Sequence, residues 1–115
     1  MADNTHADVK SLSQLLSQLG GKPPPATTAK FGLTNQASFL KTAVTLEDIG
    51  VGAYNGVTPA LQSPDLASAF GSIVQVEGRH SAALRMAAGM DPSPQAFEKP
   101  LSAGQASAAA SQFTQ

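Results

Sequence analysis

Three side chains that can bind a metal ion, Glu47, Glu77 and His80, lie where helical periodicity calls for apolar residues. Glu77 and His80 stand three apart in IVQVEGRHSAALR, residues 73–85, so both are on neighbouring positions of one helix. At about 100° of rotation per residue, four apolar residues fall within roughly 40° of Glu77: Leu66, Phe70, Ile73 and Leu84. We therefore expect Glu77 at the middle of an apolar stripe.

Glu47 occupies the same kind of position in the preceding helical pattern. Four neighbours lie within roughly 40° of its direction: Leu40, Ala43, Val51 and Tyr54. Asp48 and Lys41 are turned away by about 100° or more, as surface charges would be. Two adjacent helices are thus predicted to direct one carboxylate each into the interface between them.

A buried carboxylate becomes protonated, pairs with a cation or binds a metal ion, because an isolated charge in an apolar interior is costly. The basic residues are expected on outer faces or in connections: Lys10, Lys22, Lys30, Lys41, Arg79 and Arg85. A metal ion would neutralise Glu47 and Glu77 and take His80 as a neutral ligand. Glu on one helix and Glu-x-x-His on another form the half-site of di-metal carboxylate bundles. A metal-free structural network, or exposure of these residues through a wrong helix assignment, remains open.

The elements that position these residues are predicted to be helices. Residues 3–19 carry leucines at helical spacing and end at a Gly pair, and 20–37 form a long proline-rich connection. Residues 36–57 form the next helix, whose glycines favour close helix-to-helix approach, although part of it could instead be strand or loop. Ser63 and Pro64 suit the start of a further helix that reaches about Ala88.

The C-terminal quarter is expected to be less regular. We divide the chain into a helical bundle over 1–89 and a Pro-broken loop with an Ala/Ser-rich tail over 90–115. Within that tail, Ser102 could cap a short helix, or the segment could be flexible. The predicted fold class is all-α, with an antiparallel helix pair over 36–89 as its strongest part.

Composition excludes several classes of protein. The 115 residues are enough for one domain, and 7 basic against 8 acidic residues give a net charge of −1. No basic surface is therefore expected to bind nucleic acid. No apolar stretch is long enough for membrane insertion, and MADNTHADVK lacks the apolar segment of a secretory signal. The absence of cysteine rules out disulfides and thiolate metal sites but leaves the compartment unknown.

FLKTAVTLEDIGVGAYNGVTPAL and AFGSIVQVEGRHSAALRMAAG together resemble the ferritin-like domain of desiccation-related and stress-related proteins. The resemblance implies a four-helix bundle with a long crossover between its second and third helices. This chain would supply three main helices and lack the first, so it is either truncated or completed by a second copy in a homo-oligomer. The family's second-helix ligands would correspond to Asp3 and His6, in DNTH. In the alternative interpretation, Asp3 caps a helix and His6 lies on the surface.

The same resemblance implies a di-iron or di-manganese carboxylate site held by Glu47, Glu77 and His80. The expected activity is ferroxidase-like oxidation of Fe(II) by oxygen or peroxide, in a stress-protective role. The alternative is a non-catalytic stress or desiccation protein in which the metal site is vestigial or absent. Tyr54 could assist as a hydrogen-bond or one-electron donor, or it could be a core aromatic residue.

Overall fold

The computed structural model describes residues 1–114 and contains four α-helices, with no β-strand among these residues. The helices are α1 (Ala2–Gln18), α2 (Gln36–Val57), α3 (Pro64–Ala87) and α4 (Ala103–Ser111), and a 3-10 turn η1 (Thr58–Ala60) follows α2. The predicted all-α class is confirmed, and the arrangement is consistent with a ferritin-like helical bundle. No helix within 1–114 has both the length and the apolar character needed to cross a membrane.

Local signals explain where the two central helices begin and end. The side chain of Asn35 accepts a hydrogen bond from Ser38 N at 2.8 Å, and Ser38 Oγ accepts from Asn35 N at 3.0 Å, a reciprocal capping box. At the start of α3, Ser63 Oγ accepts from Leu66 N at 3.3 Å. Gly89, with φ +70°, follows the last turn of α3. Residues 36–57 are therefore helical, and the strand or loop alternative for them is wrong.

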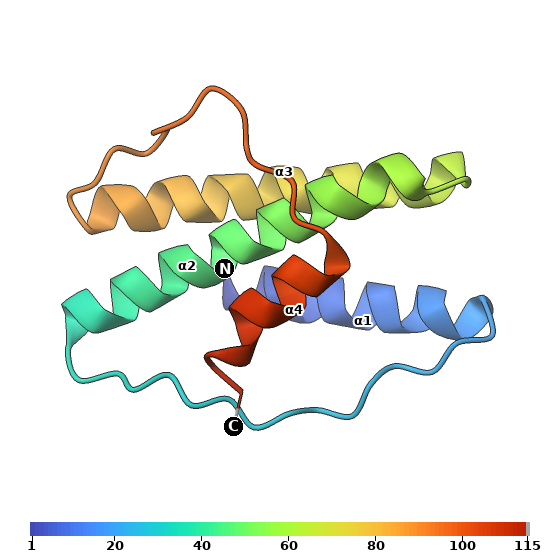
Figure 1. Cartoon of the computed structure of the whole chain (residues 1–115), viewed down its shortest axis with the longest axis horizontal. Helices are drawn as coiled ribbons and strands as arrows, with labels where there is room; N and C mark the ends of the chain where they lie inside the picture. The colour runs from blue at the N-terminus through green and yellow to red at the C-terminus, as the bar shows by residue number, and fades with distance from the viewer. Residues whose placement is uncertain (115) are drawn as a thin grey trace.

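Helices α2 and α3 run antiparallel and side by side, and this pair forms the centre of the molecule (Figure 1). Helix α4 packs across α2, so the tail folds back onto the bundle and its helical alternative is the right one. The buried hydrophobic core is small and consists of Val44, Val51 and Leu84. Helix α1 has no buried residue, so its docking depends on a few contacts.

Two glycines of α2 allow the chain to pass close to that helix on its way into α4. Leu101 N donates to Gly52 O at 2.8 Å. A Cβ atom at Gly56 would lie 1.8 Å from Leu101 O, and one at Gly52 would lie 2.8 Å from Leu101 Cγ. The close approach that the glycines predicted is therefore made by the segment around Leu101 rather than by a neighbouring helix.

We predict that Gly56→Ala lowers the free energy of unfolding by more than about 1 kcal/mol, because the new methyl group collides with backbone rather than with a movable side chain. Gly50→Ala is the matched control, since nothing lies within 4 Å of a Cβ atom there and alanine favours a helix. Urea unfolding of both variants measures the difference. Equal stabilities would contradict the close contact at Leu101.

Candidate metal centre

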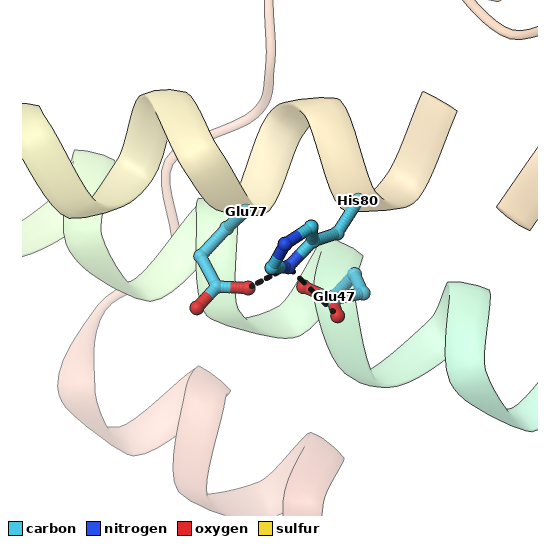
Figure 2. A group of neighbouring side chains, drawn as sticks. All are labelled: Glu47, Glu77 and His80. Atoms are coloured by element: carbon cyan, nitrogen blue, oxygen red, sulfur yellow. Dashed lines mark ion pairs between the residues drawn. The ribbon is translucent and has the colours of Figure 1, made fainter. Parts of the chain in front are cut away.

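Helices α2 and α3 bring Glu47, Glu77 and His80 together at the middle of their interface. His80 Nδ1 lies 3.5 Å from Glu47 Oε1 and 3.6 Å from Glu77 Oε2, so the imidazole stands between the two carboxyl groups (Figure 2). One ligand atom from each residue lies within 4.8 Å of the other two. The prediction that these three side chains converge is confirmed, and together they form a group that could hold a metal ion.

The group is enclosed, although all of its members are polar. Glu77 and His80 are each 8% exposed, and the side chain of Glu47 is 14% exposed. His80 Nδ1 is buried, points at both carboxyl groups and has no hydrogen-bond partner within residues 1–114. Two carboxylates and an imidazole are a donor set suited to iron or manganese. The residues present therefore fit a bound divalent ion, with Nδ1 as its nitrogen ligand.

Crowding of the two carboxyl groups shifts their proton equilibrium. Burial raises the pKa of Glu47 to about 8, and a hydrogen bond to Glu77 and the charges of Glu77 and Asp48 act in the same direction. The N-terminal ammonium group of Met1 opposes this shift in pKa weakly. Near neutral pH and without a metal ion, Glu47 is therefore mainly protonated and can donate a hydrogen bond to Glu77. Ionisation of both carboxyl groups at once is unfavourable because they are buried close together.

Asn4 of α1 contacts the other nitrogen of the imidazole. Asn4 Nδ2 lies 3.3 Å from His80 Nε2, across the interface between α1 and α3. If the Asn4 amide nitrogen donates to Nε2, a neutral ring carries its proton on Nδ1. If the amide is turned over, Nε2–H donates to the Asn4 carbonyl oxygen and leaves the Nδ1 lone pair facing the carboxyl groups. The second arrangement is the one that metal ligation through Nδ1 requires.

Tyr54 lies on the same face of α2 as Glu47. Burial raises the pKa of Tyr54 to about 12, and the negative charges of Glu77 and Asp8 add to this effect. Its ring packs edge-on against Phe70, with centroids 5.3 Å apart. Tyr54 is therefore a core aromatic residue whose phenol stays protonated near neutral pH.

A separate ion pair lies on the same two helices. Arg85 Nη2 pairs with Asp48 Oδ2, and Ser81 Oγ donates to Asp48 Oδ1 at 2.6 Å. Arg85 was predicted on an outer face, and this was wrong, because its long side chain reaches back across the helix interface and is 15% exposed. Asp48 was predicted to turn outward, and its side chain is 37% exposed. Asp48 is thereby neutralised by its own cation, which leaves Arg85 engaged and unavailable to Glu47 and Glu77.

The structure does not bring Asp3 and His6 into this group. Both are exposed, and they lie outside the set of converging ligand atoms. The face of α1 turned toward α2 and α3 carries Asp8, which is half-buried, and Asp3 and His6 are about 140–160° from it around the helix. Ligation by Asp3 and His6 stays a prediction. Asn4 and Asp8 were not among the predicted site residues, although their spacing of four residues places them on one face of a helix.

Comparison with known proteins agrees with this geometry. The family model described as ferritin-like domain matches residues 1–90, a span that includes α1, α2, α3 and all three converging residues. A search of curated proteins gave no match. Since the match covers well over half of the sequence, the chain belongs to the ferritin-like domain family.

Proposed function

We propose that this protein binds divalent iron or manganese through Glu47, Glu77 and His80. The observation that carries the proposal is His80 Nδ1, a buried nitrogen that has no hydrogen-bond partner within residues 1–114 and faces two carboxyl groups 3.5 and 3.6 Å away. A cation between these three groups would replace the shared proton, neutralise both carboxylates and satisfy Nδ1. Membership of the ferritin-like domain family adds support.

Each part of the chain has a definite task in this proposal. Helix α3 presents Glu77 and His80 from one face, and α2 presents Glu47 opposite them. Asn4 fixes the imidazole through Nε2, which sets the orientation of Nδ1. Bound iron would supply one-electron redox chemistry with oxygen or peroxide, the basis of a ferroxidase-like activity and of a stress-protective role.

A second candidate is a non-catalytic structural bundle in stress or desiccation. It is favoured by the raised pKa of Glu47, because a proton held between Glu47 and Glu77 removes one buried charge without a metal ion. The two candidates differ in metal content and in turnover. Metal analysis of freshly purified protein, followed by oxygen uptake with Fe(II), separates them.

We predict that Mn(II) raises the melting temperature of the protein and that Glu77→Gln abolishes this effect. At a free concentration 100 times the dissociation constant, a single bound ion adds about 2.7 kcal/mol to the free energy of unfolding. Differential scanning calorimetry with and without Mn(II) measures the gain. Glu98→Gln is the matched control, because Glu98 is exposed and lies outside the converging group. A wild-type protein indifferent to both Mn(II) and Fe(II) would end the metal-binding proposal.

We predict that the metal-free protein becomes less stable as the pH rises from about 5 to about 8. The pKa of Glu47 is about 8 in the folded chain against an ordinary value of 4.5, so the folded state binds the extra proton between these limits. The stabilisation that this extra proton gives the folded state is complete at a pH below the ordinary pKa. It is lost as the pH rises through the pKa that Glu47 has in the folded chain. It amounts to at most about 1.4 kcal/mol per pH unit for one proton. Urea unfolding in chelator-treated buffer should show a flatter profile for Glu47→Gln, and parallel profiles would refute the shift.

The surface of the protein supports association with a second copy. The chain exposes 7805 Å², whereas a compact monomer of 11.7 kDa exposes about 5,900 Å². Large apolar side chains of α1 and the connection after it contribute to the excess: Val9, Leu16, Leu19, Phe31 and Leu33. We propose that two copies pair about a two-fold axis, bring two half-sites together and form a di-metal centre.

Analytical ultracentrifugation tests this association. We expect a dimer whose dissociation constant falls when Fe(II) is added under anaerobic conditions, because the ions would bridge the two half-sites. Val9→Glu places a charge on the exposed apolar face of α1, where Val9 is 60% exposed, and should weaken the dimer. A monomer that is indifferent to metal would exclude the shared centre but not a mononuclear one.

A further inference from the structure

Two buried side-chain atoms without hydrogen-bond partners come from different helices. Within residues 1–114 they are His80 Nδ1 on α3 and Asp8 Oδ2 on α1. A buried carboxylate oxygen without a donor is unusual, because buried polar atoms normally find partners. The first of these atoms belongs to the candidate metal centre already described. The second has no role in it so far.

The register of α1 places Asp8 on the side that faces the metal centre. The contact between Asn4 Nδ2 and His80 Nε2 fixes which face of α1 is turned toward α3. Asp8 is one helical turn further on and shares that face. Leu12 and Leu15 continue the same line and are half-buried like Asp8, whereas Val9 is largely exposed. The part of α1 nearest the centre therefore carries a carboxylate.

The electrostatic surroundings of Asp8 are those of the same group. Burial raises the pKa of Asp8, the charge of Glu77 raises it further, and His80 lowers it. No lysine or arginine pairs with Asp8, Glu47 or Glu77 in the part of the chain described, since the only such pair is Arg85 with Asp48. Asp8 therefore shares the electrostatic environment of Glu77 and His80, and none of the three carboxyl groups is paired with a lysine or arginine within residues 1–114.

We propose that Asp8 is a further ligand of a divalent iron or manganese ion bound by Glu47, Glu77 and His80. The inference rests on the proposed metal-binding function. It gives the ion three carboxylates and one imidazole from three helices, a donor set of hard oxygen ligands with a single nitrogen. Nothing in the sequence motifs assigned this role to Asp8.

Coordination requires Asp8 to approach the other ligands, because its carboxylate lies outside the group whose atoms are within 4.8 Å of one another. Helix α1 has no buried residue, so its first turns can move without breaking a packed core. Metal binding would therefore draw α1 onto the α2–α3 pair. The ion would then connect a weakly packed helix to the centre of the fold.

The test compares Asp8→Asn with Asp65→Asn. Both variants remove one negative charge by the same change of residue, but Asp65 is exposed, lies in the first turn of α3 and is outside the converging group. Titration with Mn(II) by isothermal calorimetry gives the affinity, and the visible absorption of bound Co(II) reports the ligand set. Hydrogen exchange of the α1 amides with and without Mn(II) reports docking of the helix, and circular dichroism confirms that each variant folds.

We expect Asp8→Asn to weaken Mn(II) binding by at least about 10-fold, since even the loss of an indirect partner of a metal ligand has that effect. It should also change the Co(II) spectrum and remove the metal-dependent protection of α1, while Asp65→Asn behaves as wild type. If wild type and Asp8→Asn give the same affinity and spectrum, Asp8 is not a ligand and the three-residue centre stands. If wild-type protein binds no ion, the proposed function and the role of Asp8 both fail.

Discussion

Two carboxyl groups and an imidazole occupy the centre of a core that, within residues 1–114, contains three buried hydrophobic side chains. In so small a core, the free energy gained by burying apolar surface offsets little of the cost of desolvating charged groups. Two uncompensated charges on Glu47 and Glu77 would therefore destabilise the α2–α3 pair. A proton shared between them compensates these charges in part, and a divalent cation does so fully. The protonation of Glu47 and Glu77, or a cation bound between them, therefore affects both the chemistry of the centre and the stability of the fold.

The neighbouring Asp48 has its negative charge compensated in a different way, by a basic side chain of the protein. Asp48 lies next to Glu47 on α2, but its charge is neutralised by Arg85 and its second oxygen is bonded by Ser81. One acid of this adjacent pair thus has a protein cation, while the other has a histidine and a second acid. This difference between sequence neighbours separates a structural ion pair from a group that could hold a metal ion.

The sequence was sufficient for the parts of the fold that local patterns determine. Helical periodicity and caps located α2 and α3 to within a residue or two, and the same periodicity turned Glu47 and Glu77 inward. It failed where the outcome depends on contacts between distant segments. The face that α1 turns to the site is marked by the contact between Asn4 and His80, which the helical spacing of the leucines alone did not indicate. The close contact between Leu101 and Gly56 is a second example, because no periodic pattern in the sequence predicts it.

The end of the described chain reaches back to the connection between α1 and α2. Lys30 N donates to Phe113 O at 2.8 Å, Ala29 forms an isolated bridge with Thr114, and the rings of Phe31 and Phe113 lie 5.9 Å apart. These contacts anchor the connection near its middle, so it behaves as two shorter loops. Loop-closure entropy changes by about 0.6 kcal/mol for each doubling of loop length. A protease that trims the C-terminal residues would therefore loosen the tether of the first helix, which lies at the opposite end of the sequence.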